Sequence, residues 1–308
     1  MRVVELKPCY MTGTNPRDYK FLVSNFSMRR DLDQPSRYSI TIPFESLEKK
    51  ELVGSLFNLR YGGEVIGYGF IESIDAGVDA LQITGVGTLG MLDFYPILER
   101  AEYKEGTGLQ DVVSDLVNKA GFPSGYIQNF FSYKLPADKE FGNGQTLYDA
   151  LLEIVDMAGG WMVERKDGKI WLLSYSNLPS GGNISLDEEM IQSEFHHLGS
   201  DQLYSQVFVR DAKSKVVVKK YAYQPFPFNR RAIFYTYNGL ITEDQAKVIA
   251  ESIYQRLFIG KEKVSYVYGD MLNLELLSKV NGYLITAITI NYNLEGSDIT
   301  TTLEGFSL

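Results

Sequence analysis

The chain has 308 residues, of which 44% are hydrophobic and 13% aromatic; this excludes an intrinsically disordered protein and allows two or three domains. Its formal net charge of −9 disfavours a protein that holds nucleic acid through phosphate contacts, because such binding needs clustered lysine and arginine. One cysteine, Cys9, excludes an intramolecular disulfide framework.

No segment of the sequence predicts membrane association. No apolar run approaches the ~18 residues of a membrane helix, and residues 1–10 carry Arg2, Glu5 and Lys7 without the apolar core of a signal peptide. We therefore expect a soluble protein made in a cytoplasm.

The first 97 residues have the pattern of an antiparallel β-domain. Residues 38–42 alternate apolar and polar side chains, and residues 56–61 lead through Gly62-Gly63 into a long strand. Residues 81–86 close this meander. Because a short meander must hide its edges, we expect a β-barrel or curled sheet over residues 1–97.

Residues 98–178 change to an α/β module. Helices are expected over about 107–120 and 146–158, with Thr107-Gly108-Leu109-Gln110 as a capping box and Thr146 as an N-cap. Glycines Gly121 and Gly159 follow the two apolar stripes at the positions of C-terminal caps. A hairpin over 161–174 turns at Lys166-Asp167-Gly168.

Residues 179–308 return to β-structure after the linker 177–183, which is rich in proline, glycine and serine. One helix, about 243–259, begins at a capping-box candidate, Thr242-Glu243-Asp244-Gln245. We expect a second β-barrel that contains this helix.

The end of the chain repeats a pattern from its first domain. Residues 67–74 and 282–288 both begin Gly-Tyr and continue as β-rich runs, and each run is followed by a turn and a Thr-containing strand that ends in glycine, at 81–85 and 298–305. The pattern predicts two related β-domains with a different module between them.

This order resembles the baseplate or tail hub proteins of bacteriophages, a family that includes the N-terminal half of type VI secretion spike proteins. Three stretches show the resemblance: 67–92; 107–121 with 141–171; and 242–260 with 283–303. The segment 269–275 departs from the family pattern because it lacks a proline before the last hairpin.

The resemblance implies two tube-type β-barrels per chain and a homotrimeric ring that joins the sixfold tail tube to a threefold spike, with a channel for DNA. It implies a virion baseplate location and partners in a tail tube or distal tail protein above, a spike or tail-tip protein below, and other baseplate proteins. No catalytic residue, cofactor or metal is expected, and no specific nucleic-acid or membrane binding. The acidic charge suggests a channel lined by acidic residues.

Catalytic and metal-binding interpretations have weak support in the sequence. His196 and His197 are adjacent and would point apart, Cys9 lacks an activating context, and Asp187-Glu188-Glu189 is typical of the first turn of a short helix. The G-x-G-x-x-G-like segment 85–90 lacks a βαβ unit.

Two aromatic groups have structural and functional interpretations. Trp161 and Trp171 are expected to flank one hairpin and pack on the helices, while Tyr221, Tyr223, Phe226 and Phe228 suit a protein–protein contact or an ordinary surface loop.

Two alternative functions remain open. One is a β-sandwich carbohydrate-binding or adhesin-type protein, and the other is an enzyme with an unrecognised carboxylate site.

Overall fold

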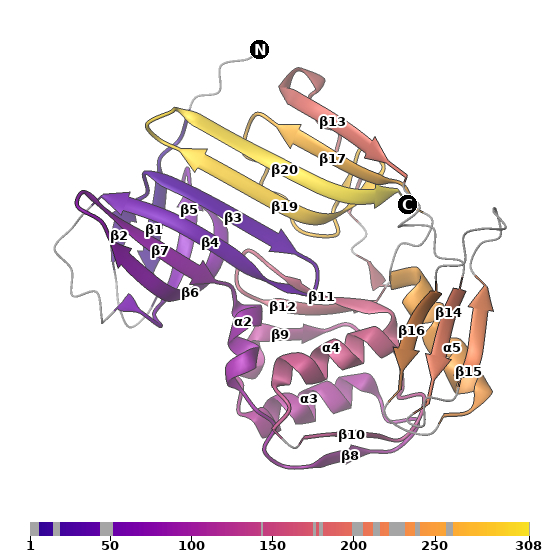
Figure 1. Cartoon of the computed structure of the whole chain (residues 1–308). Coiled ribbons are helices and arrows are strands. Elements are labelled where there is room, and N and C mark those ends of the chain that lie inside the picture. The colour runs from indigo at the N-terminus through magenta and orange to yellow at the C-terminus, as the bar shows by residue number, and fades with distance from the viewer. Residues whose placement is uncertain are drawn as a thin grey trace.

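The computed structural model describes residues 6–14, 19–43, 52–142, 144–174, 177–178, 181–198, 206–211, 216–221, 232–237, 241–256 and 261–307. The fold is α+β and mainly β, as the sequence predicts: a large antiparallel sheet lies beside a helical module and a small third sheet (Figure 1).

Twelve strands form the large sheet in the order β13-β17-β20-β19-β3-β4-β7-β6-β5-β1-β2, with β18 beside β19. The strands from the first part of the chain are β1 (Cys9–Gly13), β2 (Lys20–Leu22), β3 (Asn25–Asp31), β4 (Gln34–Pro43), β5 (Leu56–Tyr61), β6 (Glu64–Ala76) and β7 (Ala80–Val86). Those from the last part are β13 (Ile191–His197), β17 (Lys263–Tyr268), β18 (Lys279–Val280), β19 (Tyr283–Asn293) and β20 (Asp298–Ser307).

The two parts of this sheet repeat one another. The order β3-β4-β7-β6-β5 in the first part matches β13-β17-β20-β19-β18 in the second, and every pair is antiparallel. Both central hairpins contain a bulge at the same place. It lies between Ile71 and Ser73, where Ile71 faces Gly85, and between Ile285 and Ala287, where Ile285 faces Gly305.

The predicted duplication is thus visible in the strand registers, with two differences from the sequence pattern. Gly67 lies within β6, whereas Gly282 is in a turn with φ of 86°, so these two glycines are not equivalent. The β6–β7 ladder ends at Ala76 opposite Leu81, whereas the β19–β20 ladder continues past its matching pair, Ile290 with Thr301, through Asn291, Tyr292 and Asn293.

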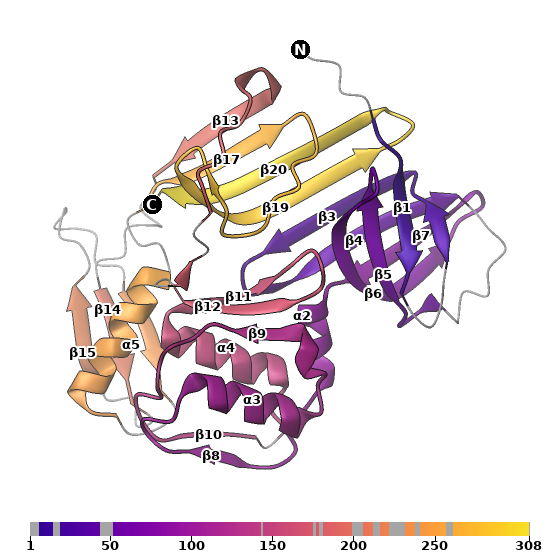
Figure 2. The same cartoon turned by 180° about the vertical axis from the view of Figure 1, so that it is seen from behind.

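The two parts join through β19 and β3, where Thr289 faces Arg29 (Figures 1 and 2). The sequence predicts two separate barrels; among the described strands the ladder instead runs as one path from β13 to β2, with no pairing that closes either part. The physical reason is that β19 uses its outer edge to pair with β3, so each part covers an edge of the other.

Alternating side chains give this sheet one apolar and one polar face. A row across six strands faces the core: Ile74, Ile83, Ile40, Phe26, Tyr292 and Ile299. The neighbouring row consists of Ser73, Thr84, Ser39, Ser27, Asn291 and Thr300, and the side of the sheet on which this row lies is called the polar face below. Within it, Ser27 Oγ donates to Asn291 Oδ1 at 2.8 Å across the β3–β19 join.

The middle module contains two helices, α3 (Leu109–Ala120) and α4 (Leu147–Ala158). The α4 N-cap is Thr146, as predicted, and its hydroxyl accepts from the Asp149 amide at 3.1 Å. The capping box predicted at Thr107 is wrong, because α3 begins after Gly108 and the Thr107 hydroxyl donates back to the Lys104 carbonyl. Both C-cap glycines, Gly121 and Gly159, have the expected left-handed conformation.

Small strands complete the module. They are β8 (Ala101–Tyr103) paired with β10 (Lys139–Phe141), and β9 (Ile127–Asn129) beside the hairpin β11 (Gly160–Glu164) and β12 (Ile170–Ser174). Short helical turns α2 (Thr88–Met91) and η1 (Leu92–Phe94) lead in from β7, and η2 (Ser124–Tyr126) precedes β9.

The β11–β12 hairpin separates two hydrophobic cores. Trp161, Val163 and Leu173 pack into the core of the large sheet, whereas Met162 and Leu172 pack into the core of the helices. The prediction that Trp161 and Trp171 pack on the helices is therefore wrong; alternation turns both toward the large sheet, and Trp171 also receives Arg165 over its ring at 4.0 Å.

A third sheet, β15-β14-β16, lies beside the helix α5 (Glu243–Arg256). Its strands are β14 (Gln206–Arg210), β15 (Val216–Tyr221) and β16 (Ala232–Thr236). The α5 capping box is present as predicted: the Gln245 side chain accepts from the Thr242 amide at 2.7 Å, and the Thr242 hydroxyl accepts from the Gln245 amide at 3.4 Å.

Both α5 and β14 pack into the core of the helical module, through Ala246, Ile249, Ala250, Val207 and Val209. The cores thus divide the chain differently from the expected 179–308 domain, because the apolar face of α5 meets α4 and not the large sheet. The three-domain division itself stays a prediction.

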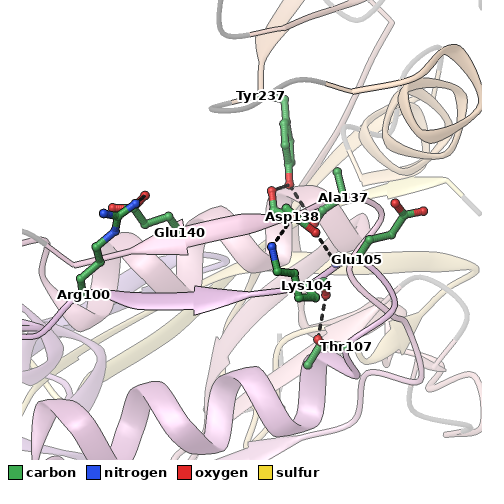
Figure 3. Close-up of polar contacts among 8 residues, drawn as sticks. All are labelled: Arg100, Lys104, Glu105, Thr107, Ala137, Asp138, Glu140 and Tyr237. Atoms are coloured by element: carbon green, nitrogen blue, oxygen red, sulfur yellow. Dashed lines mark hydrogen bonds and ion pairs between the residues drawn. The ribbon is translucent and has the colours of Figure 1, made fainter.

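Figure 3 shows how the third sheet is tied to the module. Tyr237 directly follows β16. Its hydroxyl lies 3.1 Å from the Asp138 carbonyl oxygen and 3.3 Å from the Ala137 carbonyl oxygen. The Asp138 carboxylate in turn accepts from the Lys104 ammonium and the Glu105 amide, both at 2.8 Å. A second ion pair, Arg100 with Glu140 at 2.6 Å, lies on the same two-stranded ribbon.

Candidate assembly surfaces

Strand β13 forms one border of the large sheet and is exposed on both faces. It pairs with β17 along one edge, and it stands at the end of the strand order. Six of its seven side chains are exposed; Phe195 is 63% accessible, and Leu198 just beyond the strand is 58% accessible. An edge at the end of the described strand order, with exposed apolar side chains, is a template for pairing with another chain.

The two histidines lie on this strand and point to opposite faces, as the sequence predicts. The His196 ring lies 2.7 Å from Glu194 Oε1 and 3.1 Å from the Tyr283 hydroxyl, while His197 stacks near Phe195 with ring centroids 6.2 Å apart. They do not converge on one site.

A second edge segment lies on β6. The ladder between β6 and β5 ends with Phe70 opposite Leu56, whereas β6 continues to Ala76. Along this continuation Ser73 and Ile74 are half-buried, Asp75 and Ala76 are exposed, and Val78 in the following turn is 91% accessible.

The polar face bears charges of both signs. Glu304 lies 2.9 Å from the Lys263 ammonium and 3.6 Å from the Arg29 guanidinium, and Arg37 lies 3.8 Å from Glu72. Arg29 also pairs with Asp31 at 2.7 Å, and alternation places Asp75 and Asp298 on the same face, so the polar face carries paired charges and additional carboxylates.

Asp33, in the turn between β3 and β4, joins three parts of the fold. Its carboxylate accepts from the Met162 amide at 2.6 Å and from the Arg256 guanidinium at 2.8 Å, and Arg256 also pairs with Asp156 at 2.6 Å. Burial raises the pKa of Asp33 to about 6, although Arg256 opposes this shift. The large sheet, the hairpin and α5 therefore meet at one ion cluster.

Glu164 is a second buried carboxylate at a junction. It is 1% accessible and accepts from the Ser36 amide at 2.8 Å, the Thr88 hydroxyl at 2.8 Å and the Leu89 amide at 3.3 Å. Burial raises its pKa above the usual value, and these donors act in the opposite direction. Since the donors come from β4 and α2, Glu164 fastens the module hairpin to the first part of the sheet.

No sequence motif marks Asp33 or Glu164 as special. A carboxylate within the apolar run Trp161-Met162-Val163 is the one local signal for Glu164, and Asp33 looks like an ordinary turn residue. A carboxylate with a shifted pKa can mark a catalytic site. Both carboxylates here, however, already accept hydrogen bonds from amides, a hydroxyl or a guanidinium of the chain itself.

The remaining sequence candidates lie apart from one another. Cys9 is buried in the core of the large sheet, and burial raises the pKa of its thiol, which disfavours the reactive thiolate. The Asp187 side chain caps the short helix η4 (Glu188–Met190), as expected for a charged first turn. The aromatic loop at 223–228 lies outside the described residues.

No group of three or more His, Cys, Asp or Glu side chains among the described residues is placed to hold a metal ion. No described helix is long and apolar enough to span a membrane.

No family model and no curated protein matches the chain by sequence. Solved structures match nearly its whole length. The 43 kDa tail protein of prophage MuSo2 from Shewanella oneidensis has a TM-score of 0.70 at 11% identity, with 98% of each chain covered. A tail protein from Neisseria meningitidis MC58 has a TM-score of 0.73 at 13% identity, with 98% of this chain and 97% of that chain covered.

A third match extends the likeness to secretion systems. The E. coli c3393 protein is described as a type VI secretion component structurally similar to the T4 tail proteins gp27 and gp5. Its TM-score is 0.63 at 11% identity, with 97% of this chain and 76% of that chain covered. The chain therefore has the fold of phage tail proteins, which is the fold that the sequence resemblance implies.

Proposed function

We propose that the protein is a structural hub of a phage tail baseplate or a related contractile injection device. In this proposal three copies form a ring, and their six β-repeats match a sixfold tail tube while the ring's own symmetry matches a threefold spike. The observation that supports it is the pair of repeats in one sheet, with the same strand order and the same bulge opposite Gly85 and Gly305.

The fold likeness to phage tail proteins supports the same role. The proposed location is the virion baseplate, after synthesis in the host cytoplasm. The partners would be a tail tube or distal tail protein on one side, a spike or tip protein on the other, and further baseplate proteins around the ring. The proposed mechanism is architectural, without a catalytic step.

We propose further that the polar face lines a channel through which DNA passes. This lining agrees in sign with the acidic one expected from net charge, although Arg29, Arg37 and Lys263 pair with some of the carboxylates on that face. A surface of hydroxyl groups, amides, paired charges and additional carboxylates offers DNA no cluster of cations to which its phosphates could bind.

The carbohydrate-binding alternative has less support. It requires the two similar hairpins to face each other in one sandwich, whereas they occupy equivalent places in two repeats of a continuous sheet.

The experiment is mass photometry of the purified chain over a concentration series, followed by negative-stain electron microscopy. We expect a three-copy species whose end-on class averages show a ring with a central opening. A chain that remains monomeric at the highest concentration, or that binds a glycan array with its exposed aromatics, would contradict the hub proposal.

A further inference from the structure

The β3–β19 join inside the chain has a matching pair of strand edges, and no pairing between described strands joins them within one copy. By strand order, β13 is the equivalent of β3, and β6 is the equivalent of β19. Strand β3 is paired on both edges, with β4 and β19, whereas the one described strand that pairs with β13 is β17. The β6 segment 73–76, equivalent to the part of β19 that meets β3, extends past the end of its ladder with β5.

We infer that β13 of one copy pairs, antiparallel, with the 73–76 segment of β6 in the next copy, so that the ring closes by repeating the join already made within each chain. This inference rests on the proposed ring and adds its contact surface. The strand that pairs with the β13 edge is therefore supplied by a second copy of this chain. That copy carries β6, the equivalent of β19, and β19 already pairs with β3, the equivalent of β13.

The register follows from the two bulges. They make Asp75 equivalent to Thr289 and Ala76 equivalent to Ile290. Gly85 and Gly305 are equivalent residues. Following the paired residues from Gly85 across β4 to β3 leads to Met28, and following them from Gly305 across β17 to β13 leads to His196. His196 is therefore equivalent to Met28, and the next residue, His197, is equivalent to Arg29. Since Thr289 faces Arg29 and Ile290 faces Met28, the expected pairs are Asp75 with His197 and Ala76 with His196.

The side chains fit this register. Asp75 would face an imidazole across the strands, and opposite or hydrogen-bonding partners stabilise such pairs. Phe195 would face Gly77, where an aromatic ring covers the space that a glycine leaves. The exposed Val78 would lie on the other face of the sheet, opposite Glu194, so Phe195 and Val78 would lose exposure on opposite faces of the join.

A disulfide across the expected pair tests the register. The Asp75→Cys/His197→Cys variant should form disulfide-linked dimers and trimers under mild oxidation, visible on non-reducing gels. Asp75→Cys/Ser193→Cys is the matched control, because a shift of four residues along β13 moves the second thiol by ~13 Å, beyond disulfide reach. Arg29→Cys/Thr289→Cys tests the equivalent geometry within one chain and should close without a change in mass.

A charge variant tests the same surface without new thiols. Phe195→Lys/Asp75→Lys places like charges at diagonal positions on one face of the join and should reduce the three-copy species at least tenfold at fixed concentration. Both side chains are exposed in the single copy, so helical circular dichroism and the melting temperature should stay unchanged. Val248→Lys, a half-exposed position on α5, is the control that should leave assembly intact.

The outcomes separate this inference from the hub proposal. A three-copy ring that resists both the Asp75/His197 crosslink and the lysine pair would overturn the β13–β6 contact and leave the ring standing. A chain that neither assembles nor crosslinks at high concentration would overturn both.

Discussion

At the scale of single residues, two buried carboxylates hold the parts of this molecule together. Asp33 accepts from an amide of the hairpin and a guanidinium of α5, and Glu164 accepts from β4 and α2. Such groups are costly to desolvate, and removing one partner leaves the others unsatisfied. Their effects on stability are therefore large and distinguishable.

The Glu164→Gln variant should lower the free energy of unfolding by about 1–3 kcal/mol, because the amide NH2 would face one of the donors that the carboxylate now accepts. Denaturant unfolding followed by tryptophan fluorescence measures this directly. Glu140→Gln is the matched control; it breaks an exposed ion pair with Arg100 and should cost about 0–1 kcal/mol. Equal losses in both variants would refute the junction role of Glu164.

Asp33 should make stability depend on pH. Its pKa is about 6 in the folded protein and near 4 in an unfolded chain, so the unfolded state ionises first as pH rises. The stability contributed by the protonated group is complete below about pH 4 and is lost as the pH rises through about 6 to higher values. The free energy of wild type minus that of Asp33→Asn should therefore fall by about 2–3 kcal/mol over this range. A flat difference would contradict the raised pKa.

At the scale of elements, helix ends test how sequence signals become structure. The Thr146→Ala variant should cost about 1 kcal/mol locally, because the Asp149 amide loses its acceptor. Hydrogen exchange of the first turn of α4 should then be about fivefold faster. Thr107→Ala removes a hydroxyl that does not cap a helix and should leave the first turn of α3 unchanged; faster exchange there would show that Thr107 is a cap after all.

The same elements show which features could be predicted from the sequence. Turns and caps depend on residues a few positions apart, so Gly62-Gly63, Gly121, Gly159 and the α5 capping box were predictable. Thr107 fits the same pattern but lies one residue before the N-cap, which the backbone path into α3 decides.

Features that depend on contacts between distant segments were harder to predict from the sequence. Alternation along β11 shows that Trp161 and Met162 face opposite ways, but not which core each one meets. The docking of α5 on α4 and the β19–β3 join depend on contacts between distant segments, and no local pattern encodes them. The assembly edge on β13 had one signal, the weak alternation of Ile191–His197, which is typical of a strand without a buried face.

At the scale of the whole molecule, the charge of the polar face determines how the proposed channel treats DNA. The Ser39→Lys/Thr84→Lys/Thr300→Lys variant would bring nine added lysines together in a three-copy ring. We expect it to bind short duplex DNA with a strong salt dependence, while wild type does not bind at physiological salt. Fluorescence anisotropy over a salt series measures both.

The control carries the same added charge elsewhere. Gln110→Lys/Ser114→Lys/Asn118→Lys places the lysines in one row on the exposed side of α3, away from the polar face. Equal DNA affinity in the two variants would show that the polar face does not line a common channel.

The unequal length of the two central hairpins affects the rotational angle at which a neighbouring protein can dock on the ring. In a three-copy ring the longer β19–β20 hairpins and the shorter β6–β7 hairpins would alternate around one rim. A ring of six identical subunits would offer a neighbouring protein six equivalent angular positions for docking. In the three-copy ring each chain supplies two different hairpins, so the six positions fall into two distinct sets of three. A threefold neighbour could then select one set and reject the other, and either hairpin could change in length without changing its counterpart.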